Sequence, residues 1–208
     1  MTGPHAAARL VVFLRWPEPG RVKTRLIPRL GPDGAARVYE RLARRTLDAV
    51  AQARTPGLTR LALVTPDERV DAARALFGGP LAWAGQGSGD LGRRLARAFG
   101  DAFAAGAPAV VAIGSDCPGL DGPRIDEAFA RLAAGDDAVL GPARDGGYYL
   151  IGLRRPCPEV FDGIPWSTDR VLEQTRARLR VTGARWSELP VLRDVDVPDD
   201  LPEWCDDP

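Results

Sequence analysis

A loop with several cationic residues follows the first apolar segment of the chain. It runs from Arg15 to Leu26 and contains Arg21, Lys23 and Arg25 at alternate positions. If the second half of the loop is extended, these three side chains point the same way, and together with backbone N–H groups they could hold a diphosphate. The loop is not a Walker A motif, because no G-x-x-x-x-G precedes Lys23. The structural alternative is a solvated surface loop in an arginine-rich protein.

Carboxylates follow two other apolar segments, at the points where strands of a sheet would end. Asp116 comes after Ala109–Ile113, and Asp194 and Asp196 come after Val191-Leu192. In an extended segment Asp194 and Asp196 face one side. Carboxylate oxygens suit Mg²⁺ or Mn²⁺, which would neutralise phosphate charge, so the sequence predicts a metal site at these three aspartates. Asp116 could instead begin a turn through local hydrogen bonds alone.

A third acidic motif contains Asp145-Gly146-Gly147-Tyr148. Asp145 could orient a sugar hydroxyl or act as a general base, and the two glycines would let backbone approach a ligand closely. Further along the chain, Trp166 could stack on a sugar ring. The structural alternatives are a plain Asp-Gly hairpin turn and core packing of the tryptophan.

The segment Gly87–Gly92 matches G-x-G-x-x-G, the dinucleotide-binding pattern, and opens a helix. The preceding apolar segment, Leu81–Ala84, is short and late in the chain, and Asp90 would place negative charge beside a pyrophosphate. The sequence therefore disfavours a nicotinamide dinucleotide site here.

Composition excludes several function classes. The only histidine is His5, in a polar N-terminal stretch, so a Ser-His-Asp or Cys-His apparatus and a histidine-rich metal site are not expected. The 28 basic residues, of which Lys23 is the only lysine, balance 28 acidic ones, and this zero net charge argues against nucleic acid as a partner. Cys117, Cys157 and Cys205 lie far apart without a C-x-x-C pair, which fits a reducing cytoplasm. No secretion signal or membrane span is predicted.

The residues that could do chemistry are separated by alternating strand-like and helix-like segments. Strands are predicted at Leu10–Leu14, Leu61–Val64, Leu81–Ala84, Ala109–Ile113, Ala138–Leu140, Tyr148–Ile151 and Val191-Leu192. Helices are predicted from Gly31-Pro32 through Val50, from a capping box at Thr65–Glu68 through Phe77, and at Leu91–Phe103, Arg124–Ala134 and Asp169–Arg180. The alternation predicts an α/β, Rossmann-like fold with a mostly parallel sheet and helices on both faces. We expect one domain over residues 1–208, with its core at about 9–201.

The motifs together resemble a family of small bacterial GT-A-type glycosyltransferase-like proteins in the nucleotide-diphospho-sugar transferase superfamily. That family includes members assigned to arsenosugar biosynthesis and is distantly similar to phospholactate and molybdenum-cofactor guanylyltransferases. The resemblance runs from about Val11 to Leu201 through the following motifs: Pro19–Leu26, Gly89–Gly92, Gly114–Pro118, Gly141–Tyr149, Pro165–Thr168 and Asp194–Asp196. The chain departs from the family pattern at Arg15-Trp16, where a Lys-Ala type of pair is common, and at Val197, where Thr is usual.

The resemblance implies a role for each motif. The nucleotide phosphates would be contacted by the Lys23 loop, through Gly20, Arg21, Lys23, Thr24 and Arg25. The base or ribose would lie near the segment Gly87–Arg93, which contains Gly89, Asp90 and Arg93. The metal would be held by Asp116. The sugar or acceptor would lie by Asp145, Gly146, Gly147, Tyr148 and Trp166.

The leading functional hypothesis is a Mg²⁺- or Mn²⁺-dependent transferase that moves a sugar from a nucleotide-diphospho-sugar to a small-molecule acceptor. Lys23 would stabilise the leaving diphosphate and Asp145 would be the base for the acceptor hydroxyl. The alternatives are a nucleotidyltransferase, which takes a nucleoside triphosphate and releases pyrophosphate, and a non-catalytic nucleotide-binding module.

Overall fold

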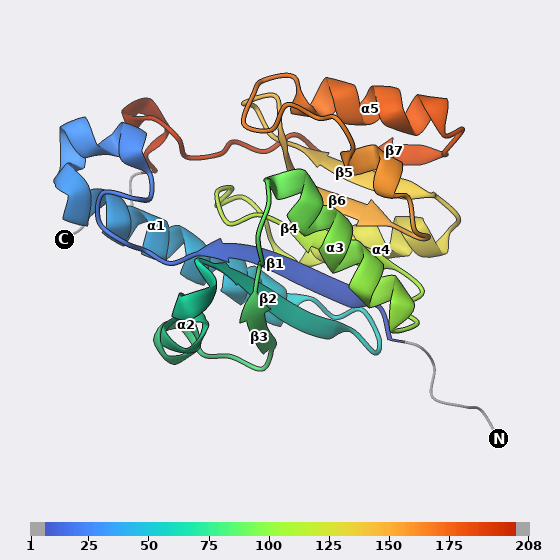
Figure 1. The fold of residues 1–208 in the computed structure, drawn as a ribbon, viewed down its shortest axis with the longest axis horizontal. Coiled ribbons are helices and arrows are strands. Elements are labelled where there is room, and N and C mark those ends of the chain that lie inside the picture. The colour runs from blue at the N-terminus through green and yellow to red at the C-terminus, as the bar shows by residue number, and fades with distance from the viewer. Residues whose placement is uncertain (1–6, 203–208) are drawn as a thin grey trace.

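A seven-stranded sheet crosses the computed structural model, which describes residues 7–202; His5 and Cys205 lie outside these residues. The strand order is β3-β2-β1-β4-β6-β5-β7 (Figure 1). The strands are β1 (Arg9–Arg15), β2 (Thr59–Thr65), β3 (Ala82–Gly85), β4 (Val110–Ile113), β5 (Ala138–Pro142), β6 (Tyr148–Leu153) and β7 (Trp186–Glu188). Only β6 runs antiparallel to its neighbours, so the predicted mostly parallel sheet is confirmed.

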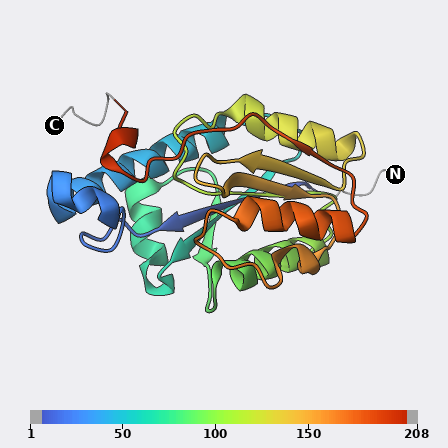
Figure 2. The same ribbon diagram turned by 90° about the horizontal axis from the view of Figure 1, so that it is seen from above.

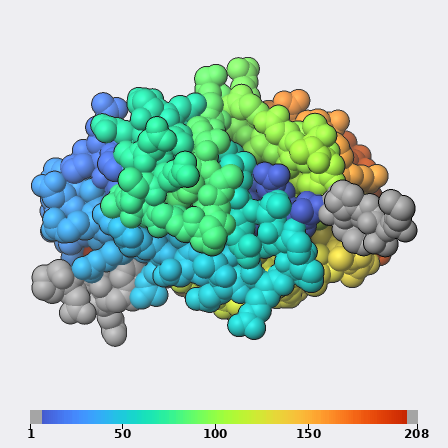
Figure 3. Space-filling view, turned by 90° about the horizontal axis from the view of Figure 1, so that it is seen from below, coloured from blue at the N-terminus to red at the C-terminus, as the bar shows by residue number. Residues whose placement is uncertain are grey.

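Helices cover both faces of the sheet, as expected (Figure 2). On one face lie α1 (Ile27–Gln52), α2 (Val70–Phe77) and α4 (Gly122–Ala133); on the other lie α3 (Leu91–Ala104) and α5 (Val171–Val181). Neighbouring residues of β1 show the arrangement, because Val11 and Val12 are both fully buried but pack into opposite cores. The view onto the β3 edge shows α2 and the residues after it beside α3 (Figure 3). Within residues 7–202, no helix is long and apolar enough to cross a bilayer.

The last strand lies elsewhere than predicted. The edge strand is β7, whereas Leu192 forms only an isolated bridge with Ala143, and Val191 is 59% exposed. Sequence reasoning missed β7 because its side chains are all half-buried, as at a sheet edge, and therefore show no apolar run.

Two predicted helix starts also differ. The capping box at Thr65–Glu68 does not form: Thr65 is the last residue of β2, its hydroxyl accepts a hydrogen bond from Arg94 at 3.3 Å, and a short 3-10 helix at Asp67–Arg69 precedes α2. The first helix begins at Ile27, one turn before Gly31, and is kinked there, since Gly31 has a φ of 68° and a ψ of 170°. A contact distant in sequence overrides the local signal at Thr65, and glycine's conformational freedom overrides it at Gly31.

The chain order places a topological switch point at β1. From β1 the chain moves to β2 and β3 on one side of it, and then crosses to β4 on the other side. Ligands of open α/β sheets bind outside the carboxyl ends of the strands at such a point. The loops after β1, β4 and β5, and the segment after β7, all reach this edge of the sheet.

Candidate active site

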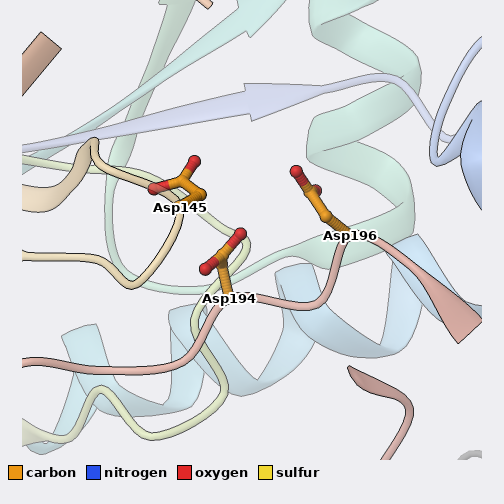
Figure 4. A group of neighbouring side chains, drawn as sticks. All are labelled: Asp145, Asp194 and Asp196. Atoms are coloured by element: carbon orange, nitrogen blue, oxygen red, sulfur yellow. The ribbon is translucent and has the colours of Figure 1, made fainter. Parts of the chain in front are cut away.

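Three carboxylates from two distant segments meet at this edge (Figure 4). Asp145 lies in the turn between β5 and β6, and Asp194 and Asp196 lie in the segment that follows β7. One oxygen from each carboxylate lies within 4.8 Å of the others. Asp145 is exposed, Asp196 is half-buried and Asp194 is buried. These three aspartates, together called the carboxylate group below, are an all-oxygen donor set of the kind that hard divalent cations prefer.

Negative charge accumulates in the carboxylate group. Burial raises the pKa of Asp194, and the charges of Asp145, Asp196 and Asp200 raise it further. Ionisation of Asp194 is therefore opposed by its surroundings in the folded protein. A cation bound to the group would relieve this repulsion.

Lys23 approaches the carboxylate group from the loop after β1, residues 16–26, which we call the lysine loop. Its Nζ contacts an Oδ1 of Asp116 and lies 3.1 Å from Oδ1 of Asp196. Burial alone would lower the pKa of this side chain, which is only 6% exposed, but the two carboxylates outweigh burial and raise it. Lys23 is therefore a fixed, fully charged ammonium between the two aspartates. The Arg25 guanidinium, 71% exposed, lies 3.6 Å from the other oxygen of Asp196.

The extended conformation that would place Arg21, Lys23 and Arg25 on one side does not form. Gly20 and Lys23 have positive φ values of 80° and 45°, and a 3-10 helix follows directly at Thr24–Leu26. The loop is thus tightly turned rather than extended. The Lys23 side chain is buried, whereas Arg21 and Arg25 are exposed, although Arg25 still reaches Asp196. Thr24 is exposed as well.

Backbone contacts hold the segment of Asp194 and Asp196 beside the other loops. The N–H of Val195 donates to the carbonyl oxygen of Asp116 at 3.0 Å, and the Val195 side chain is buried in a small cluster with Leu26 of the lysine loop. Oδ2 of Asp200 accepts the N–H groups of Asp196 (3.1 Å) and Val197 (3.0 Å). Asp116 is therefore tied to the carboxylate group through its backbone and through Lys23, and does not itself belong to it. Its assignment as a metal ligand stays a prediction.

The turn that contains Asp145 is the hairpin that the sequence offered as the structural alternative. Oδ1 of Asp145 accepts the N–H of Gly147 at 2.8 Å. Gly146 has a φ of 87°, and a Cβ there would collide with the carbonyl oxygen of Asp169; its own carbonyl accepts the N–H of Leu172 at 2.9 Å. The close approach at Gly146 is thus to protein backbone, and it fixes the turn from which the Asp145 carboxylate reaches Asp194.

The other predicted ligand contacts lie at the start of α3. Asp90 is its N-cap and accepts the N–H of Arg93 at 2.9 Å, and Gly89, Asp90 and Arg93 are exposed. Trp166 packs against Gly92 and, edge to face, against Tyr148, with ring centroids 6.4 Å apart. Trp166 is therefore part of the packing around α3. The nucleotide and sugar contacts proposed for these residues stay predictions.

Sequence reasoning missed Tyr39 and Ser115. The Tyr39 hydroxyl, from α1, accepts the N–H of Arg15 at 2.6 Å and shares a hydrogen bond with Oγ of Ser115 at 2.9 Å. Both residues are buried. The available signal was a tyrosine on the apolar face of a helix, whose hydroxyl must find a partner when buried.

Comparison with known proteins agrees with this fold. A crystal structure from Desulfovibrio desulfuricans G20, described as a "putative nucleotide-diphospho-sugar transferase", is 35% identical, covers 92% of this chain and 83% of its own, and has a TM-score of 0.84. Two others share the fold at TM-scores of 0.52. CMP:2-keto-3-deoxy-manno-octonic acid synthetase complexed with CTP is 15% identical over 93% of this chain and 95% of its own. The Rv0371C complex with manganese from Mycobacterium tuberculosis H37Rv is 18% identical over 93% of this chain and 96% of its own.

No curated protein matches the chain. Residues 46–168, more than half of the sequence and including Asp116 and Asp145, match the family described as "Uncharacterized protein conserved in bacteria (DUF2064)". With the shared fold and the 35% identity above, this match shows that the chain belongs to the DUF2064 family, whose fold is that of the nucleotide-diphospho-sugar transferases.

Proposed function

We propose that the protein is a divalent-metal-dependent transferase that moves a sugar from a nucleotide-diphospho-sugar to a small-molecule acceptor. The observation that supports this most directly is the buried Lys23 ammonium, held beside three clustered carboxylates at the switch point of the sheet. The similarity to the Desulfovibrio protein, at 35% identity, supports the same class of substrate.

The donor set fits Mg²⁺ or Mn²⁺. Asp145, Asp194 and Asp196 would hold the ion, because all three offer oxygen and because a cation offsets the repulsion that raises the Asp194 pKa. When bound, the ion would neutralise charge on the diphosphate of the nucleotide sugar. We favour this ligand role for Asp145 over general-base catalysis, since a carboxylate that shares a cation is a weaker base.

The chain's own cations would bind the rest of the diphosphate. Lys23 is a compact point charge whose position two carboxylates fix, so little reorganisation is needed to stabilise a developing negative charge. Arg25 is exposed on the same loop and is free to turn toward a phosphate from its 3.6 Å contact with Asp196. Arg21, which is also exposed, would act at longer range.

Because Lys23 is the only lysine, one isotope label tests the site directly. Protein grown with ¹³Cε-lysine gives a single side-chain resonance, and Mn²⁺ bound at the carboxylate group would broaden it. Asp194→Asn should abolish the broadening, whereas Asp199→Asn, an exposed aspartate five residues later, should preserve it. Persistence of the broadening in Asp194→Asn would contradict the metal site.

The reaction is tested by incubation with Mn²⁺ and a panel of nucleotide sugars and nucleoside triphosphates. Slow hydrolysis of a nucleotide sugar to the nucleoside diphosphate, lost in Asp194→Asn, is the expected result. Release of pyrophosphate from a triphosphate would overturn sugar transfer in favour of nucleotidyl transfer. Metal-independent binding without turnover would indicate a binding module.

A further inference from the structure

The end of β1 has a backbone donor that the sheet does not pair. The ladder between β1 and β4 ends at Val12, opposite Ile113, whereas the ladder between β1 and β2 continues to Arg15, opposite Thr65. The N–H of Trp16 donates to Thr65 on the β2 side. Since successive N–H groups of a strand point to opposite sides, the N–H of Arg15 points to the side that β4 has left.

The Tyr39 hydroxyl fills this position. It accepts the Arg15 N–H at 2.6 Å and bonds Ser115 at 2.9 Å, so one phenol connects the last residue of β1 with the residue before Asp116. Tyr39 is only 2% exposed, and it packs in the core between the sheet and the helices α1, α2 and α4. Tyr39 therefore joins the ends of β1 and β4 at the switch point. The loop after β1 supplies Lys23 and the loop after β4 supplies Asp116, and these two side chains are in contact.

We propose that Tyr39 is a positioning residue that holds the lysine loop and the Asp116 loop at the spacing needed for Lys23 to lie between Asp116 and Asp196. It touches neither substrate nor metal and acts through Arg15 and Ser115. The importance of that spacing for ligand binding rests on the proposed function; the positioning itself does not.

The chemistry of the phenol suits this task. Burial and the charge of Asp116 raise the pKa of Tyr39 to about 12, so the hydroxyl stays neutral and keeps its proton. It can thus accept the Arg15 N–H and still donate to, or accept from, Ser115. Phenylalanine would fill the same volume in the core but would leave the partly buried Arg15 N–H without this acceptor.

The test compares Tyr39→Phe with Tyr149→Phe, a matched change at another buried tyrosine. The Tyr149 hydroxyl donates to the carbonyl oxygen of Pro190 at 3.0 Å. The chain beyond Pro190 is held independently by hydrogen bonds between Leu192 and both Pro142 and Arg144, each 3.0 Å long. Loss of the Tyr149 hydroxyl should therefore leave the lysine loop in place.

Two readouts do not depend on any ligand. In Tyr39→Phe the amide exchange of Arg15 should accelerate about tenfold relative to wild type, the size expected for one lost hydrogen bond, and the ¹³Cε resonance of Lys23 should shift or broaden. Neither should change in Tyr149→Phe. If both variants lose similar stability while Arg15 exchange and the Lys23 resonance stay as in wild type, Tyr39 is only a packing residue and the proposal is wrong.

A third readout links positioning to binding. The Mn²⁺ dissociation constant should rise about fivefold in Tyr39→Phe and stay unchanged in Tyr149→Phe. If wild type binds no Mn²⁺, the proposed function fails, while the exchange and resonance measurements still decide the role of Tyr39. Should Tyr39→Phe not fold, Ser115→Ala removes one of the two contacts and keeps the phenol. Its Lys23 resonance should then shift, and an unchanged resonance would contradict the proposal.

Discussion

Replacing Asp194 by Asn should have opposite effects on stability and on metal binding. The substitution keeps the shape of the side chain and removes one charge from the carboxylate group. In the absence of metal the folded protein loses a repulsion, so it should become more stable. With Mn²⁺ present it loses a ligand, so the metal should no longer stabilise it.

The size of the gain follows from the geometry. Two unit charges at the 4.8 Å limit of the carboxylate group repel by about 3.5 kcal/mol at an effective dielectric constant of about 20 and by about 0.9 kcal/mol in bulk water. Asp145 is exposed and Lys23 already compensates Asp196, so the net value lies toward the lower figure. We expect a gain of about 1 kcal/mol, or roughly 2–4 °C in Tm for a chain of this length.

The pH dependence has a definite sign. Because the folded protein raises the pKa of Asp194, the proton stabilises the folded state. This contribution is fully present below the unfolded pKa of about 3.9 and is lost as the pH rises through the higher folded value. At neutral pH wild type therefore bears the cost of the ionised group. The stability advantage of Asp194→Asn should be present at pH 7, shrink as the pH falls through the raised folded pKa, and be gone below about pH 3.9.

Thermal unfolding with and without Mn²⁺ tests both effects. At a concentration of Mn²⁺ 100 times its dissociation constant, wild type should gain about 2.7 kcal/mol, so the order of stability of the two proteins should reverse. Asp199→Asn is the control, since it removes the same charge from an exposed position in the same segment. A variant that is less stable than wild type without metal, or that Mn²⁺ stabilises as much as wild type, would refute the reasoning.

Three further predictions concern the lysine loop and the Asp145 turn. Lys23→Arg should weaken binding of a nucleoside diphosphate about tenfold by calorimetry, because a planar guanidinium cannot replace a point charge that is 6% exposed between two carboxylates; full affinity would make the single lysine an accident of composition. The folded state raises the Lys23 pKa, so the stability of wild type relative to Lys23→Met should be constant below about pH 10.4, the unfolded pKa, and should decline as the pH rises through the folded pKa. A stability difference that stays unchanged up to about pH 12 in urea titrations would contradict this. Gly146→Ala should lower the free energy of unfolding by more than 2 kcal/mol, because its Cβ collides with Asp169 and its φ is positive, whereas Gly183→Ala, with a similar φ and open space, should cost about 1 kcal/mol; equal losses would show that the turn can shift freely.

The sequence by itself determined the fold class and the edge of the sheet where chemistry could occur. Apolar runs such as Val110–Ile113 can only be buried on both faces, and their alternation with amphipathic helices permits few topologies. Because the apolar runs locate the strands, the acidic and cationic residues that follow these runs could be placed at the strand ends. Asp194 and Asp196 were expected on one side of their segment, and they do meet in space.

Tertiary structure alone decided which groups share a site. Asp145 joins Asp194 through a glycine turn packed on Asp169, and Asp116 is separated from the carboxylate group by Lys23. No local pattern indicates these pairings, because each joins segments that are distant in sequence. The lysine loop shows the same limit: alternation would place three cations on one side of an extended loop, but a left-handed residue at Lys23 turns the loop, and of the three only the Lys23 side chain is buried. Periodicity can describe a regular strand or helix, whereas the conformation of a loop depends on the partners that the folded chain brings to it.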